Sequence, residues 1–227
     1  MTQKYGAFIE NMQWYGEPEI SWTEWLQKAC VSDGALTELG EFLRSKLLGG
    51  TLIDVPCGLA KPETADLSVV DIATLLGVCT YVEADNDADV LGTRLHNPVR
   101  TTDGGMTIHT HLTDILAFMA QLEEHSGQYV RGIYISGLQP LKEFCEDPSN
   151  VSDVVIPYLE ALYNELDRCS KNGDLVILND ANTLVLSVDE AVFPTAHPSV
   201  ALMMRGFTCK RTCPHGKVQI YEKTDAC

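Results

Sequence analysis

The chain has 227 residues, enough for one domain with a sizeable core. Its formal net charge is -16, and no cluster of lysines and arginines reverses that field locally, so nucleic acid is disfavoured as a substrate. No apolar run approaches the roughly 20 residues that span a bilayer, and the N-terminus lacks the basic and apolar regions of a signal peptide. We therefore expect a folded cytoplasmic protein that is not bound to a membrane.

The first 48 residues are expected to form a helical cap. They contain an amphipathic run over residues 34–48, with apolar side chains at helical spacing, and two glycines at 49 and 50 that end it. Four aromatic residues lie ahead of this run: Trp14, Tyr15, Trp22 and Trp25. Two or three helices are predicted for residues 1–48, packed over the domain that follows.

Residues 49–227 show the alternation of strands and helices that is typical of an α/β sheet. Helical periodicity separates short apolar runs, and this order favours right-handed crossovers between parallel strands. The predicted strands are residues 51–55, 79–85, 106–112, 130–136 and 174–178. The predicted helices between them are residues 66–77, 115–124 and 151–170.

The end of the chain departs from that pattern. Residues 206–213 and 217–223 alternate in polarity and are joined by Pro214, His215 and Gly216, which is a hairpin signal. The sequence therefore predicts a Rossmann-like parallel sheet that is closed by a C-terminal antiparallel β-hairpin and has helices on both faces.

The first predicted strand ends in an acid and a turn of small residues, and this pattern resembles the first motif of class I S-adenosylmethionine-dependent methyltransferases. Asp54 and Gly58 match the acid and the middle glycine of that motif, whereas Pro56 and Ala60 replace its outer glycines. The resemblance extends over residues 50–224 and includes the order of the elements. It implies S-adenosyl-L-methionine as the cofactor, with Asp54, Pro56 and Gly58 among the residues that bind it.

Two further motifs follow from the same resemblance. An acid that closes the second strand would accept hydrogen bonds from both ribose hydroxyls, which places Asp85 in that role, with Asn86 beside it and Glu83 as the alternative.

The third motif is an acid after the third strand. Thr113, Asp114 and Ile115 match it, with Asp114 as the acceptor for the adenine amino group and Ile115 against the purine face. After the fourth strand, Ser136 would lie beneath the cofactor.

Each of these acids also has a purely structural interpretation. Asp54 could cap the turn that follows it, and Asp85 and Asp114 could be N-caps of helices. His109 and His111 lie two apart in a strand and could form a metal pair, but packed or surface histidines are the more frequent case. No metal is expected, because the C-terminal cysteines lack a paired Cys-x-x-Cys spacing.

The chain is therefore predicted to be a methyltransferase that acts on the oxygen or nitrogen of a small molecule. The alternatives are a nicotinamide-dependent oxidoreductase, disfavoured because the sequence has no Gly-x-Gly-x-x-Gly turn, and a binding protein without catalysis. A general base is not assigned; Asn179, Asp180 and His111 are candidates. Assembly into a homo-oligomer is left open.

Overall fold

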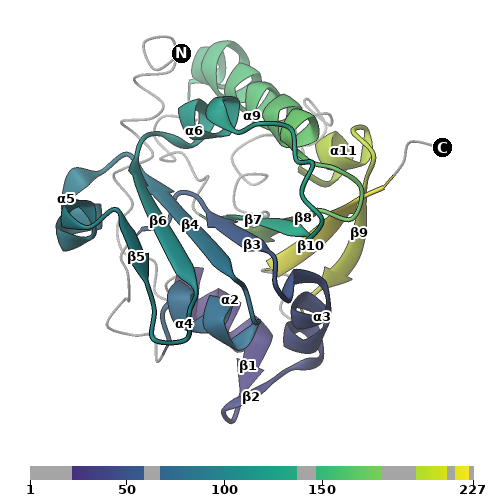
Figure 1. The fold of residues 1–227 in the computed structure, drawn as a ribbon. Coiled ribbons are helices and arrows are strands. Elements are labelled where there is room, and N and C mark those ends of the chain that lie inside the picture. The colour runs from purple at the N-terminus through teal and green to yellow at the C-terminus, as the bar shows by residue number, and fades with distance from the viewer. Residues whose placement is uncertain (1–21, 59–66, 137–146, 180–197, 214–217, 225–227) are drawn as a thin grey trace.

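An eight-stranded sheet runs through the structure, and helices pack on both of its faces (Figure 1). The computed structural model describes residues 22–58, 67–136, 147–179, 198–213 and 218–224. Among these residues, no helix combines the length and the apolar character that crossing a membrane requires.

Five parallel strands form the centre of the sheet, as the sequence predicted. Their order across the sheet is β6, β4, β3, β7, β8, so the first of them in the chain is central and the crossovers run outward in both directions. The strands are β3 (Thr51–Asp54), β4 (Thr80–Asp85), β6 (Thr107–Leu112), β7 (Arg131–Ile135) and β8 (Leu175–Asn179).

The predicted C-terminal hairpin is confirmed. Strand β10 (Val218–Lys223) pairs antiparallel with β8, and β9 (Phe207–Thr212) pairs antiparallel with β10 at the sheet edge. Strand β5 (Val99–Thr101), which the sequence did not predict, pairs antiparallel with β6 at the opposite edge. The predicted turn at 214–216 lies outside the described residues.

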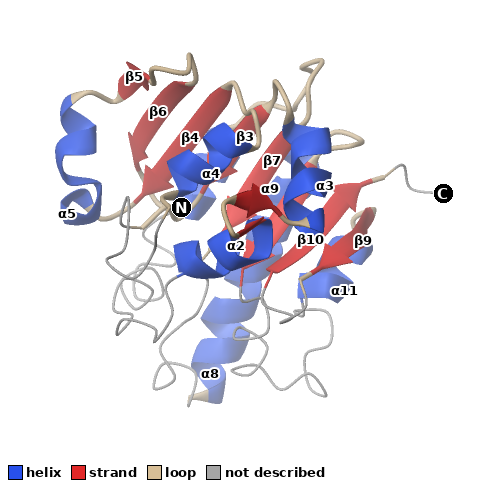
Figure 2. Ribbon diagram, turned by 90° about the horizontal axis from the view of Figure 1, so that it is seen from below, coloured by secondary structure: helices blue, strands red, loops and turns tan. Residues whose placement is uncertain are grey.

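Two layers of helices cover the sheet, and Figure 2 shows them on opposite sides of the strands. One layer contains α6 (Ile115–Gln121), α9 (Ile156–Cys169) and α11 (Pro198–Met203). The other contains α2 (Trp22–Cys30), α3 (Glu38–Leu47) and α4 (Val69–Leu75). The strand side chains alternate between these layers, so each face has its own apolar core.

The N-terminal helices belong to this second layer. Leu26, Leu43 and Leu47 are buried and lie in one cluster with Leu52 and Tyr81 of the sheet. A short hairpin joins α2 to α3. Its two strands, β1 (Val31–Ser32) and β2 (Ala35–Leu36), have two residues each. Trp14 and Tyr15 lie outside the described residues, and the domain boundary at residue 48 stays a prediction.

The long helix predicted at 151–170 begins irregularly. It starts with α8 (Pro148–Asn150) and one π-helical turn, η2 (Val151–Val155), before α9 continues to Cys169. The apolar residues of α9 recur at intervals of three and four, which buries one side of the helix against the sheet: Tyr158, Leu159, Leu162, Tyr163 and Leu166.

A buried acid fixes the amino ends of β7 and β8. Asp174 is fully buried, and its carboxylate accepts hydrogen bonds from the backbone N–H groups of Arg131 and Lys171, at 2.8 and 3.0 Å. The ring nitrogen Nδ1 of His125 lies 2.6 Å from the same carboxylate. These contacts hold the edge of the sheet that faces away from the predicted site.

Gly50, which precedes β3, tests how closely the central strand is packed. A Cβ at this position would lie 2.3 Å from the carbonyl oxygen of Val130, whereas a Cβ at Gly104 would meet no atom closer than 3.8 Å. We expect Gly50→Ala to lower the free energy of unfolding by about 2 kcal/mol or more, and Gly104→Ala to change it by less than about 0.5 kcal/mol. Urea denaturation measures both; equal effects would contradict the close approach.

Candidate functional site

The carboxyl ends of β3, β4, β6 and β7 bring the predicted site residues to one edge of the sheet. Asp54 ends β3 and is in register with Glu83 of β4 and Tyr134 of β7. Asp85 ends β4, opposite Leu112 of β6. Open parallel sheets bind ligands at this edge, so the fold places these residues where a site is expected.

Asp54 is a buried acid with an incomplete set of partners. Its side chain is 1% exposed, and the hydroxyl of Tyr81 donates to Oδ2 at 2.6 Å. The other oxygen, Oδ1, has no hydrogen-bond partner among the described residues. Burial raises the pKa of Asp54 to about 8; the Tyr81 hydrogen bond opposes the rise, while the charges of Glu83 and Asp85 add to it. The folded protein therefore holds a proton here at neutral pH.

The turn after β3 is anchored at several backbone groups. Val55 N–H donates to the carbonyl of Tyr134 at 3.0 Å, and Cys57 N–H donates to that of Ala84 at 2.9 Å. The hydroxyl of Ser136 donates to the carbonyl of Pro56 at 2.9 Å, and the Val55–Pro56 peptide is cis. Pro56 offers no N–H, and its carbonyl takes part in holding the turn instead. Ala60 lies outside the described residues.

Gly58 lies in this turn and donates its N–H to Asp85, the last residue of β4. Its φ is +58°, a conformation that favours glycine, and a Cβ built on it would meet no atom of the described residues within 4 Å. The glycine that matches the motif is therefore one whose backbone a ligand could approach closely.

Asp85 holds the turn from the second strand. Its Oδ2 accepts from the N–H of Gly58 at 2.9 Å, and its Oδ1 accepts from the N–H of Asp87 at 3.0 Å. The side chain is 7% exposed, and burial raises its pKa against the lowering effect of these two bonds. Each oxygen still has a lone pair for a further donor. Asn86, the next residue, is half-buried.

Asp114 has the structural role that the sequence left open. It is the N-cap of α6 and accepts from the N–H of Ala117 at 2.9 Å. Ile115 is buried in the core beneath α9, and Thr113 is half-buried, with its N–H donating to the carbonyl of Asp85 at 2.8 Å. The N-cap of α5 (Ala88–Leu91) is Asp87, so Asp85 does not cap the helix that follows it.

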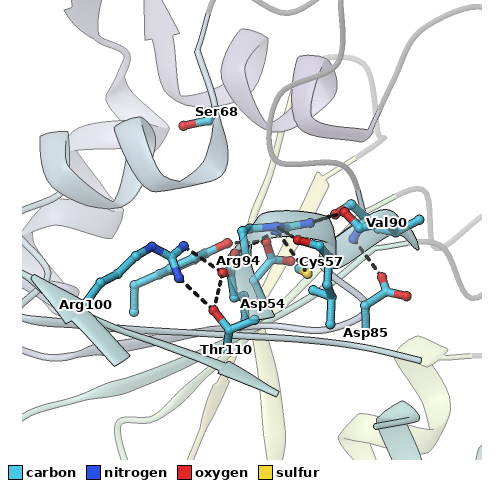
Figure 3. Close-up of polar contacts among 12 residues, drawn as sticks. Asp54, Cys57, Ser68, Asp85, Val90, Arg94, Arg100 and Thr110 are labelled. Carbon is cyan, nitrogen blue, oxygen red and sulfur yellow. Dashed lines mark hydrogen bonds and ion pairs between the residues drawn. The ribbon is translucent and has the colours of Figure 1, made fainter. Parts of the chain in front are cut away.

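Glu83, the alternative to Asp85, is committed to other partners. It is 1% exposed and forms ion pairs of 2.8 Å with both Arg94 and Arg100, while Thr110 donates its hydroxyl at 2.6 Å (Figure 3). Burial pushes its pKa upward, but the hydrogen bonds from Thr110 and Arg100 and the charge of Arg94 hold it below the ordinary value. Glu83 is therefore an ionised structural acid.

The two arginines are the site residues that sequence reasoning missed. Arg94 lies on the 3₁₀ helix η1 (Gly92–His96), and Arg100 lies on β5. The signal was present in the sequence, because a glutamate inside an apolar strand needs a buried cation and the nearest arginines downstream are these two.

The remaining candidates show packing contacts. The ring of His111 lies 5.4 Å from that of Phe118, and burial lowers its pKa. The amide of Asn179 donates to the Tyr134 hydroxyl at 2.8 Å, and Asp180 lies outside the described residues. In the part of the chain that the structure describes, no three His, Cys, Asp or Glu side chains cluster as metal ligands.

No protein-family model matches the chain, and no curated protein is significantly similar to it. Among solved structures, magnesium protoporphyrin IX methyltransferase from Synechocystis PCC 6803, with bound SAM, is 14% identical, covers 81% of this chain and 76% of its own, and has a TM-score of 0.44. The fibrillarin pre-rRNA processing protein of Methanococcus jannaschii is 13% identical over 78% and 67%, with a TM-score of 0.43. The antibiotic-resistance methyltransferase Kmr is 14% identical over 87% and 98%, also at 0.43. At this level of similarity, neither the substrates nor the site residues of these proteins can be assigned to this chain.

The class of the fold follows from this chain's own sheet. Five parallel strands are followed by a hairpin that places β10 antiparallel beside β8, and this is the arrangement that the resemblance implies. The central place of the first strand is a finding of the structure. The structure thus confirms the fold of class I S-adenosylmethionine-dependent methyltransferases.

The residues at the carboxyl edge fit the cofactor that this fold implies. Gly58 leaves its backbone open, Asp85 keeps acceptor lone pairs, and the buried Oδ1 of Asp54 lacks a partner among the described residues. S-adenosylmethionine has hydrogen-bond donors for both acids. Its adenosine carries two ribose hydroxyls for Asp85, and its amino-acid part carries an ammonium group for Asp54.

Asp54 should make stability depend on pH. An unfolded aspartate loses its proton near pH 4, whereas the folded protein keeps the Asp54 proton up to a pH of about 8. Between these values the folded state binds more protons, so this group lowers stability as pH rises, by at most about 1.4 kcal/mol per pH unit, and has no further effect above the window. Asp54→Asn removes this dependence, so the variant should gain stability relative to the wild type from pH 5 to 8. Urea midpoints measure the gain; parallel profiles would contradict it.

Proposed function

We propose that the chain binds S-adenosyl-L-methionine at the carboxyl edge of β3, β4 and β6 and transfers its methyl group to a small molecule. The observation that carries the proposal is the pairing of Asp85 with Gly58, in which the acid of the second strand meets the glycine of the first turn at 2.9 Å. This pairing joins two motifs that are 27 residues apart in the sequence.

The roles of the residues follow from their chemistry. Asp85 accepts hydrogen bonds from the ribose hydroxyls with the lone pairs that its backbone contacts leave, and Asn86 borders the same position. Asp114, Thr113 and Ile115 form the adenine end of the site.

At the opposite end of the cofactor, Gly58 allows close approach to the amino-acid part. Asp54 supplies a buried oxygen for the ammonium group, which displaces the Asp54 proton to solvent when the cofactor binds. Ser136 holds this end through the Pro56 carbonyl.

Methyl transfer makes modest demands on the protein. S-adenosylmethionine, when bound, supplies a methyl group on a positively charged sulfur, which is already activated. The chain has to hold an acceptor in line with that group in a pocket poor in water. We therefore name no catalytic side chain, and Asn179 and His111 stay candidates for a base if the acceptor needs deprotonation.

A small-molecule acceptor is favoured by the charge of the chain. With a net charge of -16, the protein repels polyanions at long range. A compact acceptor that is partly apolar or cationic avoids this cost, and residues 1–48 are proposed to contribute to its pocket. Tight binding of RNA or DNA that weakens steeply with salt would overturn this substrate class.

Calorimetric titration separates the candidate functions. We expect S-adenosylhomocysteine to bind the wild-type protein and NADH not to bind. Binding of NADH alone would support the oxidoreductase alternative. Binding of S-adenosylhomocysteine without transfer to any nucleophile in a small-molecule panel would support the non-catalytic alternative.

A pair of variants tests the role of Asp85. Asp85→Asn loses one of two carboxylate acceptors, so affinity for S-adenosylhomocysteine should fall at least about tenfold. The stability of this variant should fall as well, because one of the N–H groups of Gly58 and Asp87 loses its acceptor. Asp87→Asn is the matched control, since asparagine also caps a helix and the affinity should stay unchanged. An unaltered affinity in Asp85→Asn would place the ribose elsewhere.

A further inference from the structure

Arg94 connects the segment between β4 and β6 both to β4 and to the turn after β3. It lies on η1, in the segment between β4 and β6, and its side chain is 11% exposed. One terminal nitrogen donates to Glu83 Oε2 at 2.8 Å and lies 3.6 Å from the sulfur of Cys57. Arg94 is therefore fixed to β4 through an ion pair and placed directly against the turn after β3 (Figure 3).

The second terminal nitrogen of Arg94 binds two backbone carbonyls. It donates to the carbonyl of Gly58 at 2.7 Å and to that of Val90 at 2.8 Å, while Nε donates to the carbonyl of Leu91 at 3.2 Å. The planar guanidinium fixes these directions relative to one another, which an ammonium group cannot do. The position of the Gly58 peptide is thus tied to the end of α5.

Gly58 is held on both of its backbone polar groups by charged side chains. Asp85 accepts from its N–H, and Arg94 donates to its carbonyl. Both holders depend on β4, because Asp85 ends that strand and Arg94 is paired with Glu83 two residues earlier. With φ at +58°, Gly58 can adopt other conformations at little cost, so these two contacts select one of them.

We propose that Arg94 is a positioning residue that holds the Gly58 turn in the conformation that receives S-adenosylmethionine. The inference rests on the proposed function for the identity of the ligand. It adds to that function a side chain outside the family motifs. The outer glycines of the motif are replaced here by Pro56 and Ala60, and a clamp from η1 fixes the glycine that is retained.

Arg100 provides a matched control within the same network. It pairs with Glu83 at 2.8 Å and donates to Thr110 at 2.7 Å, and no described contact joins it to the turn. Arg94→Lys and Arg100→Lys both keep the charge near Glu83. Only Arg94→Lys loses the fixed fork that reaches Gly58.

The experiment measures two properties of both variants. Calorimetry at 15 °C gives the dissociation constant of S-adenosylhomocysteine, and hydrogen exchange followed by NMR gives the protection of the Cys57 and Gly58 amides without ligand. We expect Arg94→Lys to weaken binding about tenfold and to lose amide protection at Gly58, because a charge-assisted bond is removed. Arg100→Lys should stay within about twofold on both measures, although both variants melt at lower temperature.

Two kinds of outcome overturn the inference, and a third bears on the ligand. Wild-type affinity and protection in Arg94→Lys would show that the clamp does not set the turn. Equal losses in the two variants, or an unfolded Arg94→Lys beside a folded Arg100→Lys, would show a general scaffold role. A wild-type protein that does not bind the ligand would refute the proposed function, and with it the ligand named here. The exchange rates would then still decide whether Arg94 orders the turn.

Discussion

The ion-pair network around Glu83 is the constraint on which the carboxyl edge of the sheet depends. A carboxylate 1% exposed is costly unless cations and hydrogen bonds surround it, and Arg94, Arg100 and Thr110 supply them. Because the arginines lie on η1 and β5, satisfying one buried charge also fixes the segment between β4 and β6. That segment contributes β5 to the sheet edge, and the guanidinium of Arg94 contacts the turn after β3. The geometry of the turn is therefore set partly by residues that lie 36 positions away from it in the chain.

Three acids on neighbouring positions of this edge differ in their protonation because their surroundings differ. Glu83 is ionised between two guanidinium groups. Asp54 keeps its proton because burial dominates and, in the part of the chain that the structure describes, only Tyr81 donates to it. Asp85 lies between these cases, with two backbone donors against the cost of burial. Of the three, Glu83 has its charge neutralised within the protein, while the other two retain unused acceptor capacity. This division separates the acid that builds the edge from those available to a ligand.

The sheet was predictable from the sequence because most of its parallel strands are short apolar runs of four to six residues between helical segments. The alternating polarity of residues 206–223 predicted a hairpin, and the structure has β9 and β10 there. Strand β5 was not predictable, since three residues with only half-buried or exposed side chains carry no hydrophobic pattern. In the site, the sequence placed Asp54, Asp85 and Asp114 at the carboxyl ends of their strands, and the structure has them there; their contacts with a cofactor stay predictions. The sequence indicated that Glu83 needs a buried cation and that Arg94 and Arg100 are the nearest arginines downstream, but the pairing itself depends on where this polar segment folds back. For Asp114 the sequence allowed two roles, an N-cap and an acceptor for adenine. The structure shows the N-cap, and the contact with adenine stays a prediction.

The shared carboxylate of Glu83 also restricts how this chain can change over evolutionary time. Loss of Glu83 alone would leave two guanidinium groups at the edge of the core without their carboxylate partner. Loss of either arginine would leave the buried carboxylate with one ion pair in place of two. Substitutions at these three positions are consequently non-additive, and single steps pass through less stable proteins. Related chains should therefore carry either the whole trio or an apolar replacement of all three, and the pattern of covariation among them would identify sequences that share this edge.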